Sequence, residues 1–86
     1  MTDRIEEVAS SFRREAASVS SRGELETLKG KYLGREKGLV TAIFASLKSV
    51  PEGERVAFGK GANAVKREIE EGVRALSRRV EEAEAA

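Results

Sequence analysis

The chain has 86 residues, of which 36% are charged and 5% aromatic, and its formal net charge is +1. This length allows one small domain with a limited core, and a charge-rich, aromatic-poor composition favours long exposed helices over a thick globule. The sequence contains no Cys and no His, which excludes a disulfide framework and a thiolate zinc site and removes the commonest general base.

A first amphipathic helix is predicted over residues 1–20. Its apolar residues recur at the three- and four-residue spacing of one helical face, namely Ile5, Val8, Ala9, Phe12, Ala16 and Val19. Ser21 and Glu24 then have the spacing of a capping box, in which each side chain accepts a hydrogen bond from a free backbone N–H group. A second helix is therefore expected to start there.

Residues 21–50 are predicted to form the first arm of a helical hairpin. The apolar stripe consists of Leu25, Leu28, Tyr32, Val40, Ile43, Leu47 and Val50. Tyr32 and Val40 are eight residues apart, whereas a heptad stripe needs seven. Gly34 and Gly38 lie between them, and glycine readily takes a backbone conformation that ends or kinks a helix. A break near residues 34–38 is therefore expected.

Pro51 marks the predicted tip of the hairpin. Proline disfavours helix at the preceding Val50 and suits the first turn of a new helix, with Ser49 or Val50 as the cap. The next stripe has nearly regular coiled-coil spacing and consists of Phe58, Ala62, Val65, Ile69, Val73, Leu76, Val80 and Ala83. A helix over about residues 52–84 would be roughly 50 Å long. Gly72 lies beside this stripe, where a neighbouring helix could approach closely.

These elements predict an all-α chain, an antiparallel helical hairpin or coiled coil with a short additional N-terminal helix. We expect a single domain over residues 1–86, with the N-terminal helix at 1–20, the first arm at 21–50 and the long second arm at 51–84. The N-terminal stripe has no obvious partner in a two-stranded hairpin. It either packs on the hairpin as a third helix or causes self-association of the chain.

The net charge of +1 conceals a segregation of charge along the chain. Residues 1–28 carry −2 and residues 68–86 carry −3, whereas residues 29–67 hold nine basic and three acidic side chains and carry +6. A hairpin folded at Pro51 would thus have a basic tip, which attracts phosphates. The RNA-binding candidates are the basic residues of this segment: Lys29, Lys31, Arg35, Lys37, Lys48, Arg55, Lys60, Lys66 and Arg67.

Other clusters have structural explanations. The aromatic residues Tyr32, Phe44 and Phe58 could stack on bases, but their positions in or beside the apolar stripes favour core packing. The carboxylates of Glu68, Glu70 and Glu71 need no metal ion. Surface ion pairs at four-residue spacing explain them, between Glu70 and Lys66 or Arg74 and between Glu71 and Arg67.

Several residues together resemble a known family. These residues are the segment Lys31-Tyr32-Leu33-Gly34 together with Gly38, Pro51, Glu54-Arg55, Gly59, Asn63 and Lys66. Their pattern is similar to the N-terminal domain of the bacterial phenylalanyl-tRNA synthetase alpha chain. The resemblance covers about residues 20–75. It departs from the family at the glycines, because three residues separate Gly34 from Gly38 where the family often has two. Asn63 could be a seam residue that fixes helix register.

The resemblance implies an antiparallel coiled coil that holds tRNA(Phe) and carries no catalysis. The parent enzyme would be an ATP- and Mg²⁺-dependent phenylalanine-tRNA ligase with two alpha and two beta chains. The partners implied are tRNA(Phe), the rest of the alpha chain and the beta chain. This chain itself shows no catalytic residues, no cofactor-binding motif and no metal ligands.

Two further expectations concern placement and an alternative function. The sequence contains no apolar run that could span a membrane and no signal-peptide pattern, so we expect a cytoplasmic protein without a membrane partner. The last residues are good helix formers without a stop signal, which suggests a longer parent protein. The alternative function is a helical hairpin that binds another protein and does not bind RNA.

Overall fold

The computed structural model describes residues 3–35 and 38–85. This part of the chain folds into four α-helices: α1 (Asp3–Ala16), α2 (Arg22–Leu33), α3 (Leu39–Ser46) and α4 (Arg55–Ala85). Two short 3₁₀ helices, η1 (Leu47–Ser49) and η2 (Glu52–Glu54), connect α3 to α4. The described residues include no β-strand, so the all-α prediction is confirmed.

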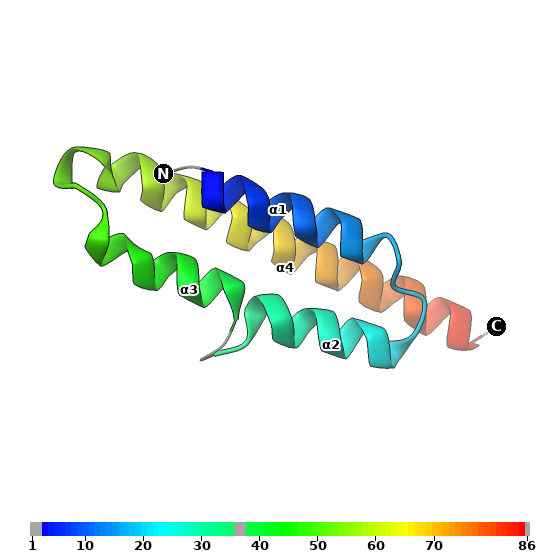
Figure 1. Cartoon of the computed structure of the whole chain (residues 1–86). Coiled ribbons are helices and arrows are strands. Elements are labelled where there is room, and N and C mark those ends of the chain that lie inside the picture. Colours follow the sequence, from blue (N-terminus) through cyan, green and yellow to red (C-terminus); the bar gives the residue numbers. More distant parts are fainter. Residues whose placement is uncertain (1–2, 36–37, 86) are drawn as a thin grey trace.

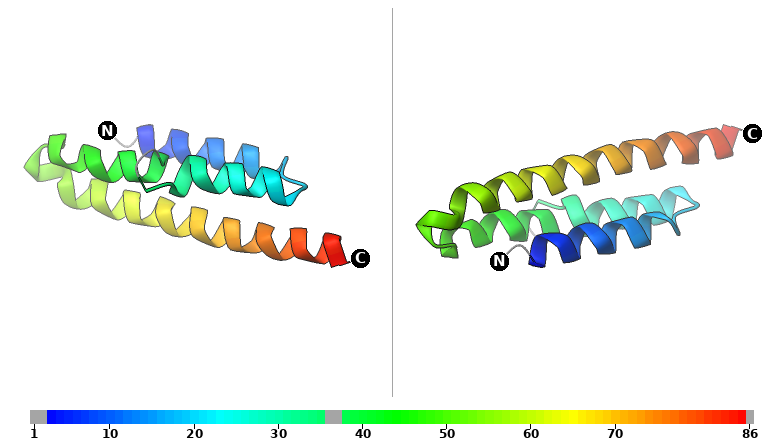
Figure 2. Two further views of the ribbon diagram at one scale, coloured as in Figure 1. Left: turned by 90° about the horizontal axis from the view of Figure 1, so that it is seen from below. Right: turned by 90° about the horizontal axis from the view of Figure 1, so that it is seen from above.

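The helices form an elongated bundle in which α1, α4 and the consecutive pair of α2 and α3 lie side by side as three helical strands (Figure 1). Helices α2 and α3 follow one another along α4 in the opposite direction, which makes the antiparallel hairpin, and η1 and η2 lie at its tip. Helix α1 runs in the same direction as α4 and contacts α2, α3 and α4. The views in Figure 2 show the same side-by-side arrangement. The bundle measures 52 × 20 × 15 Å.

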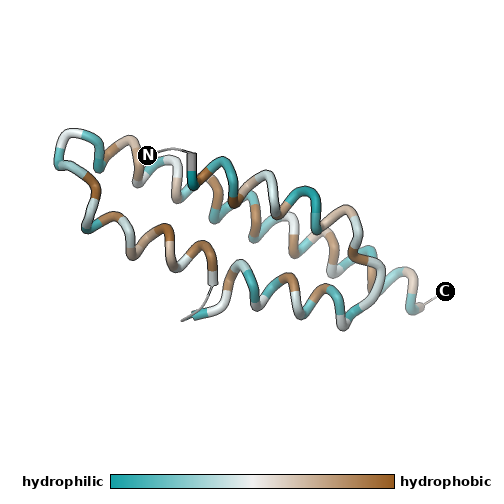
Figure 3. Tube along the Cα trace, viewed as in Figure 1, coloured by the Kyte–Doolittle hydropathy of each residue, from teal (hydrophilic) through white to brown (hydrophobic). Residues whose placement is uncertain are grey.

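One continuous apolar core runs between the helices (Figure 3). Helix α4 contributes seven of the eight residues of its predicted stripe, and these are Phe58, Ala62, Val65, Ile69, Val73, Leu76 and Val80. The eighth, Ala83, is exposed, so that prediction is wrong. Tyr32, Ile43 and Ile69 are the largest fully buried side chains of the described residues. None of the helices described is both long and apolar enough to cross a membrane.

Helix α1 is the third strand of the bundle, and its apolar stripe faces the hairpin of its own chain. Ile5, Val8, Ala9 and Phe12 are buried. The ring of Phe12 lies edge-on to Tyr32, with 5.3 Å between centroids and an interplanar angle of 82°. Of the two predicted roles for this stripe, the structure therefore supports packing on the hairpin. The stripe is satisfied within one chain.

At Gly72 a side chain of α1 packs directly against α4. A Cβ atom at this position would lie 2.7 Å from Cε2 and 2.9 Å from Cζ of Phe12. The prediction that a neighbouring helix approaches Gly72 is therefore confirmed, and that helix is α1.

The predicted capping box starts α2. Ser21 is the N-cap residue, and its hydroxyl accepts a hydrogen bond from the backbone N–H of Glu24 at 3.2 Å. The Glu24 carboxylate returns to the backbone N–H of Ser20 at 3.3 Å, one residue before the usual partner. Both bonds satisfy donors that the helix itself leaves free.

The helical arm is interrupted between Leu33 and Leu39, where Gly34 and Gly38 lie. Their φ angles are −59° and −66°, so neither glycine is left-handed. The glycines instead permit close backbone contact: the Gly38 N–H donates to the Gly34 carbonyl at 3.2 Å, and a Cβ on Gly38 would lie 2.6 Å from the Gly34 nitrogen. The Thr41 hydroxyl donates to the same carbonyl at 2.9 Å.

At the tip, Pro51 precedes η2 rather than starting α4. Its ψ angle of 144° is extended, and α4 begins at Arg55, three residues after the predicted Glu52. The Arg55 side chain donates from Nε to the Val50 carbonyl at 3.1 Å, across the turn. The 3₁₀ turn and this bond together allow the chain to reverse direction.

Candidate nucleic-acid interface

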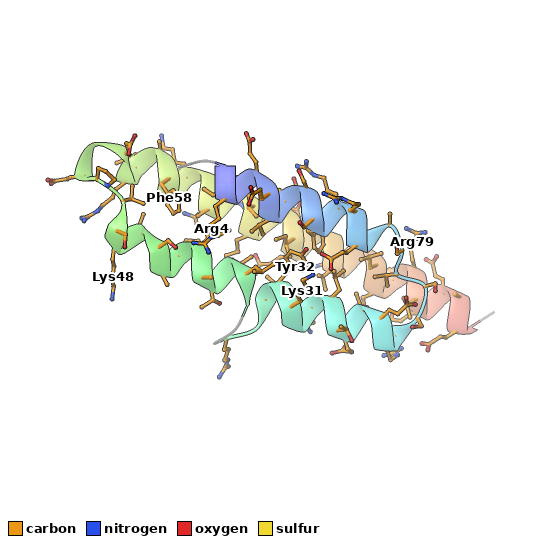
Figure 4. All side chains as sticks on the ribbon, in the orientation of Figure 1. Arg4, Lys31, Tyr32, Lys48, Phe58 and Arg79 are labelled. Atoms are coloured by element: carbon orange, nitrogen blue, oxygen red, sulfur yellow. The ribbon has the colours of Figure 1, made fainter. Side chains whose placement is uncertain are left out.

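The basic residues predicted to bind RNA are spread over several elements of the bundle. Lys37 lies outside the described residues, and the other eight are exposed. Lys29 and Lys31 are on α2, Arg35 follows α2, and Lys48 is in η1, where its side chain points away from the bundle (Figure 4). The remaining four are on α4: Arg55, Lys60, Lys66 and Arg67.

Three of these eight side chains have partners within the chain. The Lys31 ammonium lies 2.5 Å from Glu15 Oε1 and 5.6 Å from the centroid of the Tyr32 ring. Arg55 bonds the Val50 carbonyl, and the Lys66 ammonium lies 6.0 Å from the centroid of the Phe44 ring. These contacts connect helices and turns, so these three cations are less available to a phosphate.

None of the other five forms an ion pair or a side-chain hydrogen bond with another described residue, and they divide between two surfaces. Lys29, Arg35 and Lys48 belong to the arm built from α2 and α3. Lys60 and Arg67 lie seven residues apart on α4 and hence on nearly the same face of that helix. The structure therefore does not bring all the predicted residues to one site.

The contacts of α4 locate the face that carries Lys60 and Arg67. Helix α1 covers the side that includes Gly61, Glu68 and Gly72. Helices α2 and α3 cover the side that includes Lys66 and Glu84. At 100° per residue, Lys60 and Arg67 point away from both sides. They lie on the outer face of α4.

Two cations of this outer face, Arg74 and Arg78, were missed by the sequence analysis. Both are exposed and follow Arg67 at spacings of seven and four residues. They lie in residues 68–86, a segment that is acidic overall, and therefore fall outside the basic segment that ends at Arg67. The seven-residue spacing of Lys60, Arg67 and Arg74 was the signal that could have identified them.

The aromatic side chains serve the core, as predicted. Tyr32 is 0% and Phe58 is 4% exposed. Phe44 is half-buried and packs against the core from α3. Asn63 is exposed, so it is not a residue of the helix seam, and that suggestion is wrong.

The acidic residues of α4 form ion pairs between helices rather than along the helix. Glu68 accepts from Arg13 of α1 at 2.7 Å, and Glu84 accepts from Arg22 at the start of α2 at 2.8 Å. The bond to Glu68 raises the pKa of the Arg13 guanidinium above its usual value. The predicted pairs of Glu70 and Glu71 with cations on α4 are absent from the described residues. These ion pairs lie where α1 and α2 meet α4, but because they are exposed to solvent they contribute little to stability.

Glu15 joins α1 to α2 through two partners. It accepts hydrogen bonds from the Lys31 ammonium and from the Tyr32 hydroxyl. Both bonds lower the pKa of the Glu15 carboxyl, and the bond from Lys31 has the larger effect. Burial of the phenol, reinforced by its bond to the Glu15 carboxylate, raises the pKa of Tyr32 to about 12.

The Tyr32 phenol is expected to titrate about two pH units later in the folded chain than in the unfolded chain. Its ordinary pKa is about 10, and the raised pKa means that the folded state favours the neutral phenol. The stabilisation is fully present below pH about 10 and is lost as pH rises from about 10 to about 12. The sequence has one Tyr and no Trp, so tyrosinate absorbance reports this residue alone. Equal pKa values with and without denaturant would contradict the buried placement.

Comparison with known proteins places this helical bundle in a class. The family model for the N-terminal domain of class II aminoacyl-tRNA synthetases matches residues 20–86. Since this match covers most of the chain, the chain belongs to that family. No solved structure matches it significantly.

Relatives in curated collections narrow the class. The phenylalanine-tRNA ligase alpha subunit of Myxococcus xanthus is 38% identical over 86 residues, which is 100% of this chain and 24% of that protein. The corresponding subunit of Flavobacterium psychrophilum is 37% identical over 84 residues, 98% of this chain and 24% of that protein. That of Geotalea daltonii is 35% identical over 83 residues, 96% of this chain and 24% of that protein. The resemblance found in the sequence is confirmed, and the chain spans about a quarter of the length of these relatives.

Proposed function

We propose that this chain is the tRNA-binding arm of a phenylalanine-tRNA ligase alpha subunit. It holds tRNA(Phe) through backbone contacts, so that the acceptor end reaches a catalytic site elsewhere in the parent enzyme. Phosphate contacts of this kind set register and orientation without reading sequence. ATP and Mg²⁺ would act in the parent enzyme. The rest of the alpha chain and the beta chain would be the protein partners, in the cytoplasm.

The observation that supports this proposal most strongly is the set of exposed cations without an intramolecular partner among the described residues. Five side chains remain available to bind phosphate, namely Lys29, Arg35, Lys48, Lys60 and Arg67. Two cations of α1 and α2 are less available to phosphate, because Arg13 and Arg22 form ion pairs with Glu68 and Glu84. The interaction-module alternative rested on the free stripe of α1, and that stripe is buried within the chain.

The experiment that tests the proposal is a titration of the 86-residue chain with tRNA at low and at moderate salt. We expect affinity to fall steeply with salt, because each neutralised phosphate releases counterions. A plot of log K against log salt should have a slope of about −0.7 to −0.9 for each phosphate contact. Poly-glutamate, an anion without the geometry of RNA, is the control ligand. Absence of tRNA binding at low salt, or equal binding of poly-glutamate, would refute the proposal.

A further inference from the structure

A row of four cations runs along the outer face of α4. Lys60, Arg67, Arg74 and Arg78 are separated by seven, seven and four residues, and all four are exposed. At 3.6 residues per turn these spacings keep the four Cα atoms within an arc of about 40°. With a rise of 1.5 Å per residue, the row is about 27 Å long, with its first three members about 10 Å apart.

No other helix covers this row. Helix α1 occupies the side of α4 at Gly61 and Gly72, and α2 and α3 occupy the side at Lys66 and Glu84. The buried stripe of α4 lies between these two covered sides, and the outer face is on the opposite side of the helix. Among the described residues, none of the four cations takes part in an ion pair within 4.0 Å or in a side-chain hydrogen bond. Each charge is therefore available to an external anion.

The neighbours of the row on this face are polar or charged. Asn63 is exposed one turn before Arg67 and adds an uncharged amide donor. Glu71 lies at the edge of the row between Arg67 and Arg74, and Glu81 and Glu82 follow its far end. The row thus has a defined end, and a 31-residue helix holds its charges at fixed spacing without the entropy loss of ordering a loop.

The distribution of aromatic residues decides which kind of RNA fits. Proteins that bind single strands combine positive charge with aromatic side chains on which bases stack. The outer face of α4 has no exposed aromatic residue among those described, because Tyr32 and Phe58 are buried and Phe44 is on α3. Double-stranded RNA is recognised mainly through its phosphates and 2′-hydroxyls. A rigid row of cations without a stacking surface matches the second type of ligand.

We infer that the outer face of α4, through Lys60, Arg67, Arg74 and Arg78, is the surface that follows the backbone of a double-helical part of the RNA. This inference rests on the proposed function and narrows it to one face and one kind of RNA. The bidentate guanidinium groups orient phosphates, and the Lys60 ammonium adds a point charge.

The test compares two variants of the full 86-residue chain that lose the same charge. The row variant carries Lys60→Gln, Arg67→Gln, Arg74→Gln and Arg78→Gln. The matched control carries Arg4→Gln, Arg14→Gln, Arg22→Gln and Arg79→Gln, which removes four exposed cations that belong neither to the row nor to the RNA-binding candidates. Circular dichroism should show unchanged helix content in both, since every substituted side chain is exposed.

Binding is measured with a short RNA duplex, with a single strand of the same length and with tRNA, across a range of salt. We expect the row variant to lose at least about tenfold in affinity for duplex and tRNA, and its log–log salt slope to become shallower by about 3. The control should lose less than about threefold. For the unsubstituted chain, the duplex should bind more tightly than the single strand.

The outcomes separate this inference from the proposed function. If both variants lose affinity equally, or the control loses more, the outer face of α4 is not the RNA surface, while RNA binding itself still stands. Preference for the single strand would overturn the inference in the same way. If the unsubstituted chain binds none of the three RNAs, the proposed function fails as well.

Discussion

Replacing Phe12 with alanine is expected to lower the free energy of unfolding by about 3–5 kcal/mol, the usual cost of truncating a buried aromatic side chain. Phe12 is 3% exposed and lies where three helices meet. It comes from α1, packs edge-on against Tyr32 of α2 and lies against Gly72 of α4. Because its removal leaves a cavity among all three strands, the whole bundle loses contacts at once.

The loss would be a large part of the total stability, since a domain of this size is stabilised by only about 5–10 kcal/mol. Urea unfolding followed by circular dichroism would measure it. Phe12→Leu, which conserves much of the volume, should cost less than about 1.5 kcal/mol and provides a variant that remains folded. Val56→Ala is the control, because Val56 is 70% exposed, and its effect should stay within about 0.5 kcal/mol. Equal effects of Phe12→Ala and Val56→Ala would show that α1 does not pack on the hairpin.

Alanine substitutions at two glycines of α4 are expected to have opposite signs. At Gly59 a Cβ would meet no heavy atom within 4 Å among the described residues, so Gly59→Ala should stabilise the chain by about 0.5–1 kcal/mol through helix propensity. At Gly72 the added methyl group would overlap the ring of Phe12. The ring is held by Tyr32 and cannot move aside freely. Overpacking costs about 1–3 kcal/mol, so Gly72→Ala should be destabilising by about 1–2 kcal/mol.

A double-mutant cycle isolates the cause. In a Phe12→Leu background the space next to residue 72 is larger, so Gly72→Ala should lose most of its cost. The expected coupling is about 1 kcal/mol or more, within the range for residues in contact. Stabilisation by Gly72→Ala in the unsubstituted chain, or strict additivity in the cycle, would contradict the close approach of α1 to α4.

The sequence predicted the faces of the helices well because each face is encoded locally. The stripe on α4 was predicted from residue spacing alone, and only Ala83, near the C-terminal end of the helix, was assigned wrongly. Ser21 and Glu24 predicted the start of α2, because the capping box depends only on two residues three positions apart. A break was expected near Gly34 and Gly38, and α2 ends and α3 begins beside these glycines. Their φ angles are ordinary, and they matter because backbone atoms approach one another closely.

The candidate site was predicted less completely than the fold. Charge counts drew attention to the basic segment, but they could not show that Lys31 and Arg55 are committed to partners within the chain. They also omitted Arg74 and Arg78, whose acidic neighbours in the sequence point to other sides of the helix. Which cations share a surface depends on helix rotation and on which faces other helices cover.

Sequence by itself determined the all-α class, the hairpin, the residues of each apolar stripe and the family, because all of these follow from residue types at fixed local spacings. Only the tertiary structure decided that α1 is the third strand of the bundle and that Glu68 and Glu84 pair with α1 and α2. The tertiary structure likewise decided which face of α4 is left uncovered by the other helices. An apolar stripe specifies that a helix must be covered, but the choice of covering helix depends on side-chain packing between residues far apart in the chain, such as Phe12 against Gly72.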